Sequence, residues 1–454
     1  MALRKIVASA AVVLFIAACS LYNDVSIGPL ILNPAQIERG SDVQAMVNKS
    51  DFLRAIEFRP VVEARQRKSA PELMALGTAE MAAGRFDDAR RHLREALDLQ
   101  PFRETTAHIE WSLSQVEYMC NNFEPALDWA QAANSHGMAI KQWHIDYLTA
   151  LAHTNVYKYS GLPSSQIPMR ASRPDVPRID VRINGRRSVN AVIDSGAVLS
   201  IVSESFASEL SVHKLGQFRG EFFGLLGEPI SVQFGLLDSV TLGDIVLENV
   251  PVAIMPDDEM RFVVAGKREF KIDFLLGANF LKEFRTDLDF PRGVVTFYHL
   301  TSDDRRPATD QNLFVQGFRP YIRGTVNRRG WYMFVLDTGS EVTFLNDLQM
   351  MNLPLGNIPP RAHNALLQGL GGTKKRGAKI ENVEIGADRW AGTFRTVPMY
   401  SAGEHESAAG IIGENFLKNF RVVLDYGRMR VDLLRGSESY LPPKPAMVTA
   451  GAAR

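Results

Sequence analysis

The chain contains little cysteine, and this shortage excludes two common ways of stabilising a fold. Its 454 residues include only two cysteines, Cys19 and Cys120. A disulfide framework or a structural zinc site needs more. The nine histidines include no pair spaced four apart, as two metal ligands on one helix would be. The fold must therefore be stabilised by packing, and we expect no metal site.

The sequence also lacks a charge imbalance and a serine-hydrolase motif. Lys and Arg number 51, Asp and Glu number 51, and the formal net charge is zero. This gives no reason to expect nucleic acid as a partner. No Gly-x-Ser-x-Gly elbow is present, so a serine mechanism is not supported. Hydrophobic residues make up 46% of the chain, which permits sizeable cores.

The N-terminus holds an apolar stretch, Ile6 to Ala18, that is too short for a stable membrane helix. Small residues stand directly before Cys19, and this pattern resembles the bacterial lipoprotein signal. Residues 1–19 are therefore predicted to be a signal peptide that ends at a lipidated Cys19, with a plain secretory signal as the alternative. Because Ser20 rather than Asp follows, we expect an anchor in the periplasm at the outer rather than the inner membrane.

Two Asp-Ser/Thr-Gly triplets carry the strongest chemical signal. Each ends an apolar run, with the aspartates at Asp194 and Asp337, and a hydroxyl residue (Ser200 or Thr343) follows each aspartate by six positions. Two facing carboxylates share a proton, so one can act as a base on water while the other hydrogen-bonds the substrate carbonyl. The two aspartates are therefore the predicted catalytic pair. A simple turn at each site is the alternative.

A second repeated element indicates a duplication. The segment Phe274–Leu281 recurs as Gly410–Leu417, and the glycine inside each copy follows its aspartate by 83 and 76 residues, respectively. Both copies continue into Phe-Arg and then Leu-Asp followed by an aromatic residue. An internal repeat of this length predicts two related lobes.

These motifs resemble those of the retropepsin-like aspartic proteases over about residues 175 to 436. The resemblance implies an all-β pepsin/retropepsin-like two-lobed acid protease domain, with lobes at 178–300 and 313–436. It also implies that each lobe gives one aspartate and a hydrophobic-hydrophobic-Gly segment that packs across the active-site loop. The residues that it assigns to the catalytic loops are Asp194, Ser195, Gly196 and Ala197, and Asp337, Thr338, Gly339 and Ser340.

The same resemblance implies glycine-tipped flaps about 30 residues after each aspartate. The candidate glycines are Gly224, Gly227, Gly369, Gly371 and Gly372. Ordinary hairpin turns are the alternative.

One difference between the lobes suggests how the proton is shared. Ser340 follows the second glycine, where the first lobe has Ala197. A hydroxyl that donates to the outer oxygen of Asp337 would favour its charged form. We therefore predict that Asp337 carries the charge and Asp194 the proton.

The remaining sequence divides into helical and linking parts. Residues 51–159 show helical patterning with small residues and a closing proline that resemble tetratricopeptide repeats, and a plain helical bundle is the alternative. Residues 160–177 are predicted to be a linker. Hairpins with turns at Asn184-Gly185 and near Asn327 to Gly330 should lead into the two aspartates. Residues 437–454 are predicted to be a disordered tail.

The function predicted from this sequence is an aspartic endopeptidase that is lipid-anchored in the periplasm and cuts a polypeptide substrate without a cofactor. The helical region would bind a protein partner. The alternative is a periplasmic scaffold lipoprotein that binds peptides without cutting them. Pairing of lobes from two different chains also remains open.

Overall fold

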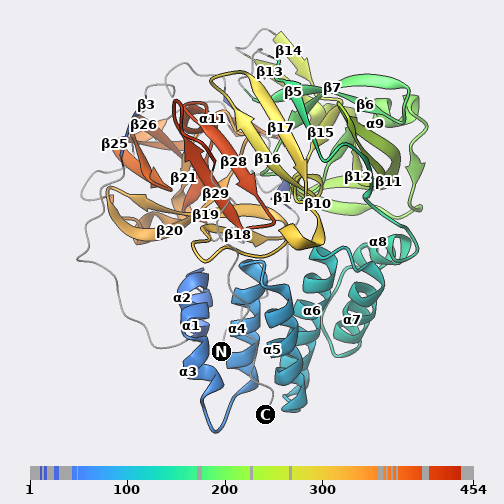
Figure 1. The fold of residues 1–454 in the computed structure, drawn as a ribbon, viewed down its shortest axis with the longest axis vertical. Helices are drawn as coiled ribbons and strands as arrows, with labels where there is room; N and C mark the ends of the chain where they lie inside the picture. Colours follow the sequence, from blue (N-terminus) through green and yellow to red (C-terminus); the bar gives the residue numbers. More distant parts are fainter. Residues whose placement is uncertain are drawn as a thin grey trace.

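Helices form a layer beneath two β-rich lobes that lie side by side, as Figure 1 shows. This structure is a computed structural model. It describes residues 11–12, 15–17, 25–29, 43–48, 50–170, 176–224, 229–264, 268–355, 361–363, 367–369, 372–374, 377–400 and 408–440.

The helical layer begins earlier than the sequence predicted, at residue 43 instead of 51. Its helices are α1 (Val43–Asn48), α2 (Phe52–Glu57), α3 (Arg59–Glu63), α4 (Ala70–Ala82), α5 (Phe86–Asp98), α6 (Arg103–Met119), α7 (Phe123–Ser135) and α8 (Gln142–Ala152). Ser69 caps α4 by accepting from the amide of Glu72. A Cβ on Gly77 would stand 2.7 Å from Leu93 Cγ, so this small residue lets α4 and α5 pack closely. The relation to tetratricopeptide repeats stays a prediction.

The first lobe is built on a sheet in the order β1-β10-β11-β6-β7-β15-β8-β12-β4, with β9 at the side of β11. The bounds of these strands are β1 (Ala11–Val12), β4 (Lys158–Gly161), β6 (Arg178–Ile183), β7 (Arg187–Ile193), β8 (Ile201–Ser203), β9 (His213–Lys214), β10 (Gly220–Gly224), β11 (Pro229–Leu242), β12 (Ile245–Met255) and β15 (Phe274–Leu276). Helices α9 (Glu204–Glu209) and α10 (Ala278–Leu281) and a separate hairpin of β13 (Arg261–Val264) and β14 (Arg268–Lys271) complete it.

The second lobe repeats this plan with the order β18-β19-β20-β27-β21-β26-β25-β22, and β3 pairs with β26. Its strands are β3 (Val25–Pro29), β18 (Leu313–Gln316), β19 (Arg319–Val326), β20 (Arg329–Leu336), β21 (Phe344–Asn346), β22 (Arg361–His363), β25 (Gly377–Ala387), β26 (Trp390–Tyr400) and β27 (Gly410–Ile412). Helix α11 (Glu414–Leu417) follows β27, and a small sheet joins β2 (Phe15–Ala17), β23 (Leu367–Gly369) and β24 (Gly372–Lys374).

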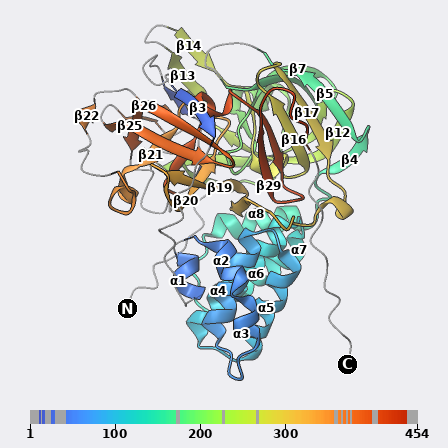
Figure 2. The same ribbon diagram turned by 60° about the vertical axis from the view of Figure 1, so that its left-hand side comes forward.

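A third sheet joins the lobes and corrects the predicted linker. Its order is β29-β28-β16-β17-β5, which combines the ends of both lobes: β5 (Ser164–Pro168), β16 (Phe284–Asp289), β17 (Val294–His299), β28 (Arg421–Asp425) and β29 (Arg430–Leu434). The prediction of a linker over 160–177 is therefore wrong in part, because β5 pairs with β17 and the end of β4 pairs with β12. Figure 2 shows β16, β17 and β29 of this sheet above the helical layer.

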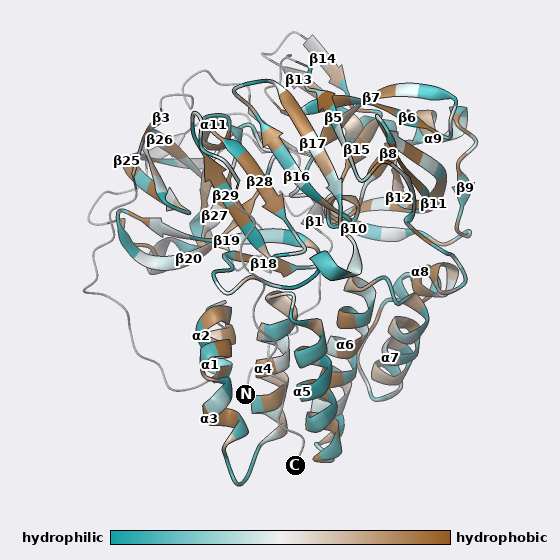
Figure 3. Ribbon diagram, in the orientation of Figure 1, coloured by the Kyte–Doolittle hydropathy of each residue, from teal (hydrophilic) through white to brown (hydrophobic). Residues whose placement is uncertain are grey.

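Both lobes rest on the helices through apolar contacts. Under the second lobe, the ring of Phe52 lies 5.8 Å from that of Phe314. Under the first, Tyr147 of α8 lies 4.6 Å from Phe234. In Figure 3 apolar colour marks the sheet strands and much of α4, whereas α5 is largely hydrophilic. Among the residues that the structure describes, no helix is long and apolar enough to span a membrane.

The tail prediction is tested only at its beginning. Tyr440 lies within the predicted tail, yet its hydroxyl donates to Asp425 Oδ2 at 2.8 Å. Residues 441–454 lie outside the described part of the chain, as does Cys19.

Candidate active site

Two hairpins deliver the aspartates, as the sequence predicted. In the first lobe β6 and β7 pair around Asn184 and Gly185, which both have positive φ (50° and 64°). In the second lobe β19 and β20 pair around Asn327 and Arg328, with φ of 49° and 61°. Such turns match the twist of the flanking strands.

Each catalytic loop is then fixed by the glycine segment of its own lobe. β15 pairs in parallel with β7, and β27 pairs in parallel with β20. The amide of Asp194 donates to the carbonyl of Leu276 at 3.0 Å, and the amide of Asp337 donates to that of Ile412 at 3.0 Å. The repeated segment therefore orients both aspartates in the same way.

The two loops interlock through their hydroxyl residues. Ser195 Oγ donates to the carbonyl of Leu336 at 2.6 Å, and Thr338 Oγ1 donates to the carbonyl of Ile193 at 2.8 Å. Each hydroxyl also accepts from the other residue's amide at 3.1 Å. All four bonds are buried and cross between the lobes of one chain. The structure therefore pairs the lobes within a single molecule.

The glycines show how closely the carboxyl groups approach each other's loops. A Cβ on Gly196 would lie 2.4 Å from Asp337 Cγ, and a Cβ on Gly339 would lie 2.3 Å from Asp194 Cγ. No other residue fits at either position without moving a carboxylate. The glycines are thus required by this close approach, in addition to any role in the turn.

The carboxyl pair has an unusual electrostatic environment. Both side chains are fully buried, and they hydrogen-bond each other. Burial, together with the charge of Asp337, raises the pKa of Asp194 well above its ordinary range. Burial also raises the pKa of Asp337, to about 7, although amides and Arg319 oppose the shift. Asp194 thus keeps the proton, and Asp337 ionises first.

The explanation that the sequence offered for this asymmetry is wrong. Ser340 Oγ donates to the carbonyl of Val342 at 2.9 Å, so its single proton is not available to Asp337. Backbone amides stabilise the carboxylates instead. Gly339 N donates to Asp337 Oδ1 at 2.8 Å, and Ala197 N donates to Asp194 Oδ1 at 3.0 Å.

Two asparagines support the site and were not singled out from the sequence. Asn279 Oδ1 accepts from the amide of Ser200 at 2.7 Å and from its hydroxyl at 3.0 Å. In the second lobe Asn415 Oδ1 accepts from the amide of Thr343 at 2.8 Å. The signal that could have found them is their recurrence in both copies of the glycine segment.

The flap candidates lie in hairpins. β10 pairs with β11 next to Gly224, and β23 pairs with β24 so that Gly369 stands opposite Gly372. Gly227 and Gly371 lie outside the described residues.

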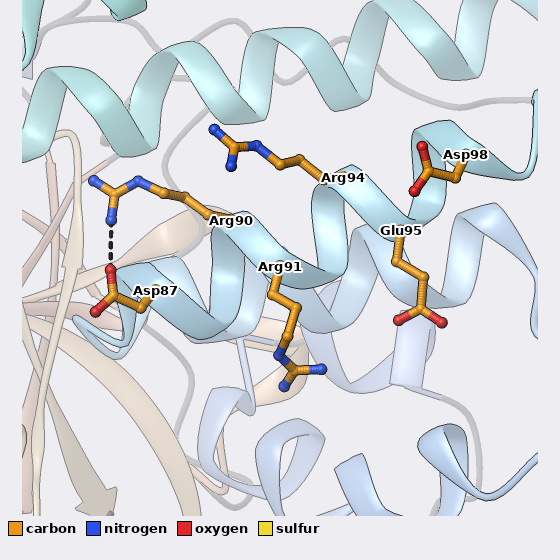
Figure 4. Close-up of a pocket in the computed structure, with 6 residues that line it drawn as sticks. All are labelled: Asp87, Arg90, Arg91, Arg94, Glu95 and Asp98. Atoms are coloured by element: carbon orange, nitrogen blue, oxygen red, sulfur yellow. Dashed lines mark hydrogen bonds and ion pairs between the residues drawn. The ribbon is translucent and has the colours of Figure 1, made fainter. Parts of the chain in front are cut away.

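No metal site competes with this dyad in the part of the chain that the structure describes, where no group of three or more His, Cys, Asp or Glu residues could hold an ion. The hollow in Figure 4, of about 600 Å³, is elsewhere. It lies along α5 and is lined by Asp87, Arg90, Arg91, Arg94, Glu95 and Asp98. Charges of both signs on one exposed helix face do not form a catalytic pair.

Comparison with known proteins agrees with the first lobe. Residues 179–280 match the family model described as aspartyl protease. A retropepsin-like aspartic protease from Rickettsia conorii is 16% identical, and the match covers 32% of this chain and 96% of that one, with a TM-score of 0.21. An aspartic proteinase from Irpex lacteus is 11% identical over 60% of this chain and 98% of that one, with a TM-score of 0.38. The comparison with curated proteins gave no match.

The fold and the site together define an aspartic-protease-like domain. The matched residues include the first catalytic loop and its glycine segment. The second lobe lies outside the match and supplies the same elements by internal repetition.

Proposed function

We propose that this protein is an aspartic endopeptidase, lipid-anchored in the periplasm. One observation carries the enzymatic part of the proposal. Asp194 and Asp337 hydrogen-bond each other in a fully buried site that is held by reciprocal bonds between the lobes. Backbone amides donate to Oδ1 of each carboxyl, whereas Asp194 Oδ2 and Asp337 Oδ2 are buried and accept from no amide or hydroxyl of the protein.

The geometry supports general acid–base hydrolysis. The ionised Asp337 takes a proton from water as the water oxygen bonds to the peptide carbonyl carbon, and Asp194 gives its proton to the carbonyl oxygen. As the C–N bond breaks, Asp337 gives its proton to the departing amine, and the hydroxyl proton returns to Asp194. The dyad ends in its starting state, and no cofactor takes part.

Proteolysis by the chain without residues 1–19 tests this proposal. An unfolded protein substrate should be cut near pH 7, where Asp337 ionises while Asp194 keeps its proton, and both Asp194→Asn and Asp337→Asn should abolish cutting. Mass spectrometry of the products distinguishes internal from terminal cleavage. Cutting that persists in both variants would refute the role of the dyad. Binding of substrate without any cutting would instead indicate a peptide-binding scaffold.

We also propose that the helical layer binds a protein partner. Phe102 is 90% exposed and Leu99 is 45% exposed, and both lie at the turn between α5 and α6. The charged hollow on α5 extends to Asp98, next to this turn. Crosslinking in cells with a photoreactive residue at position 102, compared with one at the exposed Asp128, tests for a partner there.

The anchor and its location rest on the sequence around Cys19. A lipidated protein should incorporate labelled fatty acid and fractionate with the outer membrane, and Cys19→Ala should lose the label. A labelled Cys19→Ala protein would refute the assignment.

A further inference from the structure

One buried arginine of the first lobe has no polar partner in the described part of the chain. Arg178, at the start of β6, is only 6% exposed, and its Nε and Nη2 atoms are buried without a hydrogen-bond acceptor. Its guanidinium lies over the ring of Phe270, 4.7 Å from the ring centroid. Burial lowers the pKa of this group, and no described carboxylate opposes the shift. A cation that is buried without a counter-charge destabilises a fold.

The two other buried basic side chains among the described residues, one lysine and one arginine, are paired. Lys282 is also 6% exposed and forms an ion pair with Glu283. Arg319 donates to the hydroxyl of Tyr321 at 2.7 Å. The fold therefore pairs the positive charges that it buries elsewhere, and its stability does not explain Arg178. Exceptions of this kind are expected mainly at functional sites.

Arg178 stands beside the first catalytic loop. It is the strand partner of Val192 in β7, two residues before Asp194, and the carbonyl of Pro177 accepts from the amide of Ile193 at 2.9 Å. Paired residues of an antiparallel sheet share a face, and so do alternate residues along a strand. Arg178 and Val192 therefore lie on the face that continues to Asp194. Strand geometry separates Arg178 from Asp194 by about 7 Å along the strands and about 5 Å between them.

The surroundings on this face are apolar. Val192 belongs to a buried cluster that includes Ala197, which follows the catalytic glycine, and Phe222 of β10. Phe270, over which the guanidinium lies, packs against the same cluster. The cluster thus joins the catalytic loop to the flap-candidate hairpin. An apolar wall with a few fixed polar groups is typical of a ligand site.

The second lobe has a different residue at the matching position. Tyr321 pairs with Val335, which precedes Asp337 by two residues. Its side chain is neutral, and its hydroxyl accepts the hydrogen bond from Arg319. Only the first lobe places a cation with unused N–H groups at this position. The two sides of the catalytic pair therefore differ in charge.

We propose that Arg178 forms a subsite for an acidic side chain of the substrate, on the first-lobe side of the dyad. Its Nε and Nη2 groups can donate two parallel hydrogen bonds to one carboxylate, the geometry in which arginine binds carboxylates best. Such a pair would neutralise a charge that is otherwise buried alone. The proposal rests on the proposed function and names a substrate class for the same site: an extended peptide with a glutamate or aspartate on one side of the cut bond.

Binding of blocked peptides tests the subsite without requiring cleavage. The probes are fluorescent peptides of leucine, phenylalanine and threonine with both ends blocked, and they carry one glutamate at each position in turn. A matching set carries glutamine instead. Anisotropy is measured at about pH 6.5 with the full-length chain carrying Asp194→Asn. At one position the glutamate peptide should bind about tenfold more tightly than its glutamine counterpart, because hydrogen bonds between charged groups are the stronger ones.

Substitutions of two arginines on β6 supply the test and its control. Arg178→Gln should abolish the preference for glutamate, and Arg178→Lys should keep part of it, because lysine keeps the charge without the planar fork. Arg182→Gln removes the same charge from an exposed position of the strand and should leave the preference unchanged. Equal or absent binding of both peptide sets at every position would overturn the proposal. A preference that survives in Arg178→Gln, or is lost in Arg182→Gln, would also overturn it.

Stability measurements distinguish a ligand site from a structural role. Because a buried charge without a partner destabilises the free chain, Arg178→Met should raise the urea midpoint of the full-length chain. The preferred glutamate peptide should raise the midpoint of the Asp194→Asn chain, and should not do so once Arg178→Met is added. A lower midpoint in Arg178→Met would mean that the arginine stabilises the fold through a partner of its own chain, and the subsite would fail.

Hydrolysis of the same peptides by the full-length chain with its native dyad separates the two proposals. If no peptide is cut while binding still depends on Arg178, the proposed enzymatic function fails and the acidic subsite stands. If both peptide sets are cut equally well at every position, the enzyme stands and the subsite fails. Where the preferred peptide is cut, mass spectrometry of its products should place the glutamate on one fixed side of the cut bond.

Discussion

The raised pKa of Asp337 predicts how the stability of the protein depends on pH. In the folded chain this carboxyl has a pKa of about 7, against an ordinary value of 3.8. A group whose pKa is higher in the folded state contributes stability that is complete below the unfolded value and is lost as the pH rises to the folded value. A shift of about 3 units at about 1.36 kcal/mol each gives about 4 kcal/mol lost between pH 4 and pH 7.

Replacing Asp337 by Asn should remove this loss. The amide does not titrate, and the neighbouring Asp194 also loses the negative charge that helps to raise its pKa. The free energy of unfolding falls between pH 4 and 7 in both proteins. In the full-length variant this fall should be about 4 kcal/mol smaller than in the native chain. At pH 7 and above, the variant should be the more stable protein.

Urea unfolding at pH 4, 5.5, 7 and 8, followed by circular dichroism, measures this difference. Electrophoresis before and after each titration excludes self-cleavage. Asp180→Asn is the control, because Arg170 lowers the pKa of this exposed carboxyl and its contribution has the opposite sign. Parallel stability curves for the native chain and Asp337→Asn would refute the reasoning.

Four further outcomes follow from the site. Gly196→Ala should abolish hydrolysis while the chain remains folded, because its Cβ would displace the opposite carboxyl; activity and circular dichroism test this. Thr338→Val leaves buried partners unpaired between the lobes and should cost about 1–3 kcal/mol per group in urea unfolding. Asn279→Leu should lower the free energy of unfolding by a similar amount for each hydrogen bond lost, without moving the pH–rate profile. Ser340→Ala should leave the acidic limb of that profile in place, because its hydroxyl faces a carbonyl.

The sequence predicted those parts of the site that depend on local chain geometry and repetition. An Asn-Gly turn and an apolar run are enough to place a hairpin before Asp194, and the structure confirms both. The duplicated glycine segments predicted that each aspartate has the same support. Signals of this kind lie within a few residues of the groups that they position.

Features that depend on distant pairing could not be predicted in this way. β5 contains only one strongly apolar residue, Ile167, so its sequence predicts a loop. It is a strand because it pairs with β17, which lies more than 100 residues later in the chain. The hydrogen-bond partner of the Ser340 hydroxyl was predicted wrongly for a related reason. The hydroxyl could donate to the carboxylate of Asp337 or to the carbonyl of Val342. Which acceptor it reaches depends on the backbone path to Val342, and residue type alone does not show this path.

The helical layer explains a difference between the two repeats. In the first lobe the glycine segment ends in Lys282 and Glu283, both buried against the end of α6. Lys282 Nζ donates to Asn121 Oδ1 at 2.6 Å, and Asn121 Nδ2 donates to Glu283 Oε1 at 2.9 Å. Although burial disfavours the charge of Glu283, Lys282 and Arg305 lower its pKa to about 2.

In the second lobe the matching positions are Lys418 and Asn419. Asn419 Nδ2 donates to the carbonyl of Phe416 at 2.9 Å, so this side chain bonds within its own turn. The two repeats have therefore diverged at the position where the first lobe meets α6. Because Asn121 bonds to both Lys282 and Glu283, replacing Asn121 by Ala would leave these buried charges incompletely paired and would destabilise the segment that follows Gly277. The helical layer is thus a structural part of the catalytic fold as well as a candidate surface for a partner.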